Sequence, residues 1–231
     1  MSNEPYKTTS YVFNVGWSNK AKTIEWENIA SSVEEMDCDL VVLTEVSNKT
    51  KVRQFTERLS RATDGVRHYE SIIEEIGYDK IALIYDASRV KPKRDVHDYS
   101  REGKYLGALM QDQEDGKLFR SVATHLPIKN KRKVAVDALS AYICQHKTPT
   151  LIMGDFNSDP RSLKMLTDRV RGLALGDGEE DCEPTTLRGN CYDNLVHHSP
   201  KKNKHAVFID TEVLQSAFGS DHYPVVSTHQ C

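Results

Sequence analysis

The chain has 231 residues, of which 38% are hydrophobic and 28% are charged, and its formal net charge is −3. This composition is typical of a folded soluble protein, and it excludes both a disordered chain and a polycation. The length and the lack of any Pro-, Gly- or Ser-rich linker predict one domain over residues 1–231.

The cysteines and the hydropathy pattern predict where the protein works. The five cysteines are widely and irregularly spaced, which favours free thiols over a disulfide framework or a zinc site, although Cys182 and Cys191 are close enough to bridge in an oxidising setting. Residues 1–10 are polar, and the apolar runs are far shorter than the ~18 residues of a membrane span. We therefore expect a cytoplasmic protein that does not associate with membranes.

The first quarter of the chain alternates between strand and helix patterns. Expected strands are Tyr11–Val15 and Leu40–Thr44, and expected helices are Lys20–Met36 and Thr50–Ala62. A strand-rich region follows, with strands expected at Tyr69–Ile73, Ile81–Tyr85, Tyr105–Met110 and Leu118–Thr124.

The second half is expected to contain two helices, Lys131–His146 and Ser162–Val170. Its expected strands are Thr150–Met153, Tyr192–Val196, Ala206–Ile209 and Val225–Thr228. Many strands with few helices favour two sheets packed face to face, with the helices outside.

Polar residues gather at the ends of these expected strands. They are Asn14, Glu45, His125, Asp155, Asn157, Asp193, Asp221 and His222. Each alone could be a turn residue, but together on one rim the carboxylates would repel one another, and a bound cation would relieve that repulsion. Oxygen ligands without cysteine suit Mg²⁺ or Mn²⁺, and histidines can exchange protons near neutral pH. This combination predicts hydrolysis of a phosphate ester.

Five segments carry a family resemblance. They are Phe13-Asn14-Val15, Leu43-Thr44-Glu45-Val46, Thr124-His125-Leu126-Pro127, Gly154-Asp155-Phe156-Asn157 and Ser220-Asp221-His222-Tyr223-Pro224-Val225. In order and spacing they resemble the endonuclease/exonuclease/phosphatase superfamily over nearly the whole chain. The resemblance implies an α/β fold, a four-layer α/β/β/α sandwich with two packed, mainly antiparallel sheets.

Within that superfamily the sequence is most similar to deoxyribonuclease I-like nucleases. The similarity rests on Cys191–Val196, on Ser100-Arg101-Glu102 and on Ser220–Val225. It implies a Mg²⁺-dependent nuclease, with Mn²⁺ as a possible substitute, that hydrolyses DNA phosphodiester bonds as a non-specific or nicking endonuclease. It also implies that Arg101 contacts a DNA phosphate. One departure is Ser47, which stands where those nucleases carry a groove-binding arginine.

The resemblance also assigns the site residues. Glu45, Asn14 and Asp221 would form the metal site. Asp155 and Asn157 would position the attacking water and the scissile phosphate.

The remaining assigned residues handle protons and charge. His125 and His222 would act as acid/base and transition-state donors, and Asp193 would orient His222. His125 is expected to have a carboxylate partner, either Glu74 or Glu75, with Glu75 slightly favoured.

Three basic clusters could contact phosphates outside the scissile one, which would add salt-dependent affinity without sequence specificity. They are Lys91–Arg94, Lys129–Lys133 and Lys201–His205. Trp17 is expected to pack, and His197 and His198 are expected in a polar loop. No obligate protein partner is evident.

Two alternatives remain open. The first is a phosphatase or phosphodiesterase of the same superfamily that acts on a nucleotide end, an inositol phosphate or a lipid. The second is a catalytically inactive binding module, against which the complete set of site residues argues.

Overall fold

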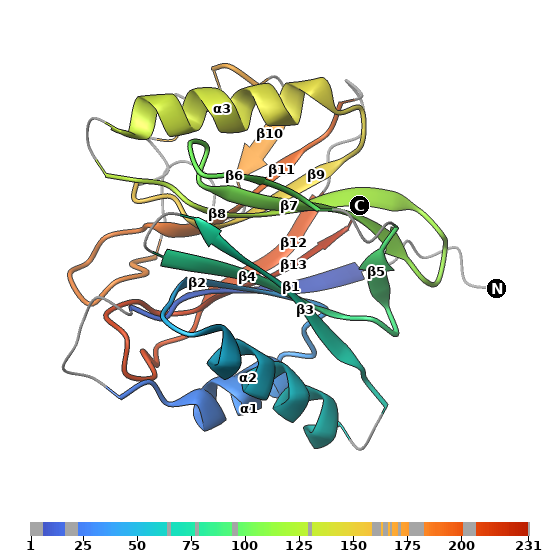
Figure 1. Cartoon of the computed structure of the whole chain (residues 1–231), viewed down its shortest axis with the longest axis vertical. Helices are drawn as coiled ribbons and strands as arrows, with labels where there is room; N and C mark the ends of the chain where they lie inside the picture. Colours follow the sequence, from blue (N-terminus) through green and yellow to red (C-terminus); the bar gives the residue numbers. More distant parts are fainter. Residues whose placement is uncertain are drawn as a thin grey trace.

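The computed structural model describes residues 7–16, 23–63, 66–76, 79–93, 97–128, 131–158, 163, 166, 168–170, 172–175, 183–200 and 207–230. Two β-sheets form its centre (Figure 1). The first sheet has the order β12 (Val207–Val213), β13 (Val225–Gln230), β1 (Lys7–Asn14), β2 (Leu40–Val46), β4 (Asp79–Asp86) and β3 (Tyr69–Ile76).

The second sheet has the order β10 (Leu173–Leu175), β11 (Asp193–His198), β9 (Thr150–Asp155), β8 (Leu118–His125), β7 (Tyr105–Asp112) and β5 (Val90–Pro92). A further short strand, β6 (Asp98–Ser100), pairs with β7. Among the paired strands described, only β1 with β2 and β8 with β9 run parallel. The predicted pair of mainly antiparallel sheets is therefore confirmed.

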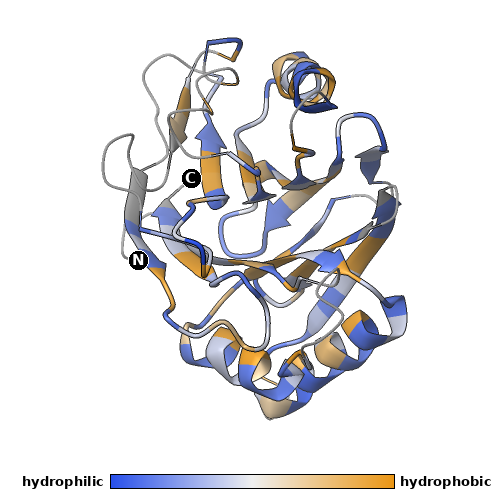
Figure 2. Ribbon diagram, turned by 90° about the vertical axis from the view of Figure 1, so that its left-hand side faces the viewer, coloured by the Kyte–Doolittle hydropathy of each residue, from blue (hydrophilic) through white to orange (hydrophobic). Residues whose placement is uncertain are grey.

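Helices cover the two outer faces of the sheets. Helices α1 (Trp26–Glu35) and α2 (Lys49–Ala62) lie against the first sheet, and α3 (Arg132–Gln145) lies against the second (Figure 1). The four layers thus follow the predicted order α/β/β/α. Figure 2 shows that the strands between the helical layers carry much of the hydrophobic sequence.

Three buried clusters correspond to the three interfaces between layers. One joins the sheets, through residues such as Val12, Leu83 and Met153. The other two join each sheet to its helices, for instance through Phe55 of α2 and Leu139 of α3. At about 25 cal/mol per Å² of buried apolar surface, these interfaces supply the main stabilising term of the fold.

The start of α2 illustrates how the sequence sets a boundary. Asn48 is the N-cap, and its side-chain oxygen accepts a hydrogen bond of 2.8 Å from the backbone N–H of Thr50. Helix α1 begins later than the predicted Lys20–Met36, at Trp26. The segment before it is instead held by a backbone hydrogen bond from Glu25 N–H to the carbonyl of Phe218, a long-range contact that helical periodicity does not encode.

The structure corrects two other details. Strands β5, β6 and β10 were not predicted, because three residues are too few to show an alternating pattern. The loop predicted for His197 and His198 is wrong, since both are buried in β11. Trp17 and part of the expected helix Ser162–Val170 lie outside the described residues.

The cysteines divide into two kinds. Cys38 and Cys144 are free, as predicted, whereas Cys191 is disulfide-bonded, so the free-thiol prediction is wrong for Cys191. Cys182 and Cys231 lie outside the described residues. None of the helices in the described part of the chain has the length and apolarity needed to cross a membrane.

The strand directions bring one end of many strands to a common rim. Because β1 and β2 are parallel, Asn14 and Glu45 lie where both strands end, and antiparallel β13 begins at that same edge. Parallel β8 and β9 likewise end together at His125 and Asp155, which are register partners. We call this edge of the two sheets the polar rim.

Candidate active site

An amide joins two carboxylates on the polar rim. Asn14 Nδ2 donates to Glu45 Oε1 at 3.1 Å and to Asp155 Oδ2 at 2.8 Å, thereby connecting the two sheets. Asn14 Oδ1 accepts a hydrogen bond of 2.8 Å from Gly16 N–H. Asn14 therefore holds the carboxylates together through its nitrogen, and its role as a direct metal ligand stays a prediction.

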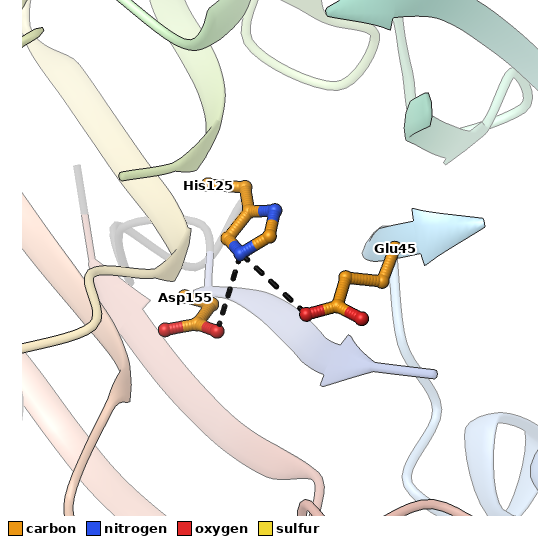
Figure 3. A group of neighbouring side chains, drawn as sticks. All are labelled: Glu45, His125 and Asp155. Atoms are coloured by element: carbon orange, nitrogen blue, oxygen red, sulfur yellow. Dashed lines mark ion pairs between the residues drawn. The ribbon is translucent and has the colours of Figure 1, made fainter. Parts of the chain in front are cut away.

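His125 lies beside the same two carboxylates, as Figure 3 shows. Its Nε2 is 3.7 Å from Glu45 Oε1 and 3.6 Å from Asp155 Oδ2. One ligand atom from each of these three residues lies within 4.8 Å of the other two, which is close enough for one cation to be shared. Carboxylate oxygens with one imidazole suit Mg²⁺ or Mn²⁺.

A second group continues from the first along the rim. His222 Nδ1 is 2.6 Å from Asp193 Oδ2, and both side chains are buried. Asp155 belongs to both groups, because its carboxylate also lies within 4.8 Å of ligand atoms of Asp193 and His222. The other carboxylate oxygen of Asp193, Oδ1, is buried as well.

The Asp193–His222 pair is charged at neutral pH. Burial by itself would lower the pKa of His222, but the charge and hydrogen bond of Asp193, with smaller contributions from Asp155 and Asp221, outweigh it and raise that pKa to about 9. His222 is thus an imidazolium, oriented through Nδ1 by a buried carboxylate.

Unusual backbone conformations occur at several positions of the site. Gly154 has a φ of 144°, and a Cβ there would lie 1.9 Å from the carbonyl oxygen of Thr124. Only glycine therefore permits the close approach of β9 to β8 that places Asp155 beside His125. Glu45 and Asn157 also have positive φ values, of 52° and 48°, which is uncommon outside glycine and asparagine.

Asn157 is fixed by both of its nitrogens. Its backbone N–H donates to Asp155 Oδ1 at 2.7 Å, and its side-chain Nδ2 donates to the carbonyl of Leu126 at 2.8 Å. Asp221 lies next to Gly16, since a Cβ on Gly16 would lie 2.9 Å from Asp221 Oδ1. Asp221 is in neither ligand group found among the described residues.

Sequence reasoning gave no role to two residues that support the site. Ser220 Oγ donates to the carbonyl of Asn14 at 2.7 Å and accepts from His222 N–H. Thr185 Oγ1 accepts from the backbone N–H of Asp193 at 3.0 Å. Ser220 could have been noticed as a hydroxyl next to Asp221, whereas Thr185 precedes no recognisable strand.

The other predicted site residues have mixed placements. Arg101 is exposed on the turn that leads into β7. This turn is close to the polar rim, because Tyr105 at the start of β7 pairs with Thr124 at the end of β8. Glu74 lies 2.8 Å from His97 and Glu75 lies 3.6 Å from Lys80, so both glutamates are engaged away from His125.

The basic clusters are only partly described. Lys91 lies in β5 and pairs with the end of β7 that is remote from the rim. The cluster Lys201–Lys204 and its neighbour His205 lie outside the described residues, as do Arg94, Lys129 and Asn130.

A family model gives the class of protein. The model of the Endonuclease/Exonuclease/phosphatase family matches residues 12–222. The chain therefore belongs to this family of hydrolases that act on phosphoester bonds, as the sequence motifs predicted. A search of curated protein sequences returns no significant match.

Solved structures agree on the fold at low sequence identity. Danio rerio TDP2 complexed with a single-strand DNA product has a TM-score of 0.75 and 15% identity, covering 97% of this chain and 99% of that one. The human Nocturnin catalytic domain has a TM-score of 0.71 and 17% identity, covering 97% of this chain and 94% of that one. A mannosyl-6-phosphatase of Bacteroides thetaiotaomicron has a TM-score of 0.68 and 14% identity, covering 97% of this chain and 100% of that one.

Proposed function

We propose that the protein is a divalent-metal-dependent nuclease that hydrolyses phosphodiester bonds of DNA as a non-specific or nicking endonuclease. The observation that carries this proposal is the continuity of the two groups on the rim, Glu45–His125–Asp155 and Asp155–Asp193–His222. A metal site next to a charged histidine provides both of the positive centres that hydrolysis of a phosphate diester requires.

The donor set fits Mg²⁺, with Mn²⁺ as a substitute. Glu45 and Asp155 would provide carboxylate oxygens, and Asn14 Nδ2 donates a hydrogen bond to each of these two side chains. Asp221 would complete or neighbour the site. When bound, the metal would neutralise charge on the phosphate and favour ionisation of a coordinated water.

The two histidines would act on opposite sides of the scissile phosphate. His222, held as an imidazolium by Asp193, donates from its other ring nitrogen to a phosphate oxygen as negative charge builds up there. His125 lies beside the carboxylates that position water, where it can exchange a proton with the attacking or the leaving oxygen. The water oxygen bonds to phosphorus while the P–O bond to the leaving sugar oxygen breaks.

Two observations favour DNA as the substrate. Arg101 lies on an exposed turn near the rim, where a guanidinium can contact a phosphate that is not itself cleaved. TDP2, which shares this fold, has been solved with single-strand DNA. The fold likeness to a mannosyl-6-phosphatase keeps a phosphomonoester substrate as the alternative to be tested.

Nicking of supercoiled plasmid tests the proposal. Wild-type protein should nick it with Mg²⁺ and not with EDTA, and His125→Ala and His222→Ala should each slow nicking by about 10²–10⁴-fold. His68→Ala is the matched control, because His68 is an exposed histidine that pairs with Glu70 away from the rim.

Three outcomes would contradict the proposal. Nicking that persists in EDTA would exclude the metal centre. Nicking at the wild-type rate in both rim variants would exclude the assigned histidines. Wild-type protein that leaves every DNA substrate intact but hydrolyses a sugar phosphate or a phosphoinositide would be a phosphatase instead.

A further inference from the structure

A cleft lies beside His125. Its volume is about 360 Å³, and Glu45, His125 and Asn157 are among the residues that line it. Lys104 and Lys131 also line it, together with the apolar segment Leu126–Ile128, which we call the apolar wall. The cleft therefore brings two lysines and an apolar wall next to the proposed catalytic groups.

The strand order defines the direction of this cleft. Along the rim of the second sheet, Asp193 opens β11, Asp155 ends β9 and His125 ends β8, in that order. Lys104 comes next, immediately before β7. Since neighbouring strands lie ~4.8 Å apart, the cleft lies one strand beyond the scissile phosphate, on the side opposite to the Asp193–His222 pair.

The backbone at Lys104 is tied to the catalytic histidine. The Lys104 carbonyl accepts hydrogen bonds from His125 N–H at 3.1 Å and from Thr124 Oγ1 at 2.8 Å. Lys104 also has a φ of 51°, an unusual conformation for lysine that the close packing of this turn maintains. The structure thus fixes the backbone of Lys104, from which this cationic side chain extends, next to His125.

The start of α3, where Lys131 lies, is anchored next to the site by the side chain of Arg132. Lys131 is the residue from which α3 begins, and the next residue, Arg132, donates hydrogen bonds to the carbonyls of Pro127 and Asn157. The first turn of α3 contains no acidic residue, so the positive end of the helix dipole adds to the charge of Lys131.

The apolar wall indicates what accompanies the second anion. Ile128 is 58% exposed, Leu126 is buried, and Ile81 adds a further apolar side chain to the lining of the cleft. Apolar surface next to two cations matches a nucleotide unit, whose phosphate needs charge and whose sugar and base need van der Waals contact. A densely phosphorylated inositol would leave this wall without a function.

We propose that this cleft binds the nucleotide next to the scissile bond, with its phosphate between Lys104 and Lys131. The inference rests on the proposed nuclease function and deepens it. The preferred substrate is then a nucleic-acid strand with at least two consecutive phosphates, one at the metal centre and one in the cleft.

Binding without cleavage gives the first test. The affinity of a fluorescein-labelled single-stranded oligonucleotide is measured by anisotropy in EDTA over a range of salt concentrations. Substituting both lysines, Lys104→Gln with Lys131→Gln, should reduce the slope of log K against log salt by about 0.7, because the one phosphate bound between them on a single strand contributes about 0.7. The control Lys117→Gln with Lys147→Gln removes two exposed lysines at the other ends of β8 and α3 and should leave the slope unchanged.

Kinetics give the second test. The ratio of kcat/KM for the oligonucleotide to kcat/KM for bis(p-nitrophenyl) phosphate, a diester with one phosphate, should fall about tenfold in the Lys104/Lys131 variant. An unchanged slope and an unchanged ratio in that variant, while wild-type protein cleaves DNA, would overturn the cleft proposal alone. Wild-type protein that hydrolyses the small diester but no nucleic acid would overturn the proposed function instead.

Discussion

Replacing Asn14 with aspartate should place three mutually repelling carboxylates together on the polar rim. In the native protein, Asn14 Nδ2 donates to Glu45 at 3.1 Å and to Asp155 at 2.8 Å. In Asn14→Asp a carboxylate oxygen takes the place of this nitrogen. Two attractive contacts thereby become contacts between like charges.

The cost can be bounded from these distances. At an effective dielectric constant of about 20, unit charges about 3 Å apart repel by roughly 5–6 kcal/mol, so the two contacts together would cost about 11 kcal/mol. Uptake of one proton removes most of this repulsion and costs about 1.4 kcal/mol per pH unit above a carboxyl pKa of ~4. The loss of stability is therefore limited to about 4 kcal/mol at pH 7 and to about 1.5 kcal/mol at pH 5.

Urea unfolding in EDTA at pH 7 and pH 5 measures this difference. Asn14→Ala is the control, because it loses both hydrogen bonds without adding a charge and should show a much weaker pH dependence. A loss below about 1 kcal/mol for Asn14→Asp at pH 7, or an equal loss at both pH values, would refute the arrangement of the three side chains.

Three further predictions test other parts of the structure. Gly154→Ala should destabilise the protein by at least about 2 kcal/mol in thermal unfolding, because the new Cβ would lie 1.9 Å from a carbonyl oxygen. The control Gly116→Ala, where the nearest atom would be 3.6 Å from the new Cβ, should cost about 1 kcal/mol. Equal losses of stability in the two variants would contradict the close approach of β8 and β9. Burial lowers the pKa of His229 to about 4 against a weaker opposing hydrogen bond from Ser227, so the unfolded chain binds more protons between about pH 6.5 and 4 and stability is lost as pH falls through that window. His229→Gln should remove about 3 kcal/mol of that pH-dependent loss relative to wild type. Parallel curves of unfolding free energy against pH for the two proteins would refute this prediction. Asp193→Asn should slow DNA cleavage by at least about a hundredfold without unfolding the protein, and a rate within a few-fold of wild type would show that His222 needs no carboxylate.

Much of the architecture could be predicted because it depends on local patterns. The face of α2 formed by Val52, Phe55 and Leu59 has helical spacing, and all three side chains are buried in the structure. The shortest strands were missed because their hydrogen bonds depend on neighbours far along the chain. The buried histidines of β11 were missed for a related reason. Two adjacent histidines are typical of a polar loop, and only the pairing of β11 with β9 shows that they continue the strand.

The candidate site was predicted in composition but not in detail. Motif resemblance placed His125, Asp155 and His222 in one site, and the structure brings them to one rim. Sequence alone could not tell that Asn14 turns its nitrogen to the carboxylates, because either end of an amide can face a neighbour. It also left the carboxylate partner of His125 open between Glu74 and Glu75, with Glu75 slightly favoured. In the structure Glu75 lies 3.6 Å from Lys80, its register partner in β4, and Glu74 lies 2.8 Å from His97.

The Mg²⁺ dependence of DNA cleavage tests the central claim most directly. The initial rate of plasmid nicking is measured against Mg²⁺ concentration for wild-type protein and for Glu45→Gln, which keeps the shape of the side chain and removes its charge. We predict saturable activation of the wild type and a half-saturating Mg²⁺ concentration at least about tenfold higher in the variant. Nicking that needs no divalent metal, or the same Mg²⁺ curve for both proteins, would contradict a metal centre at Glu45.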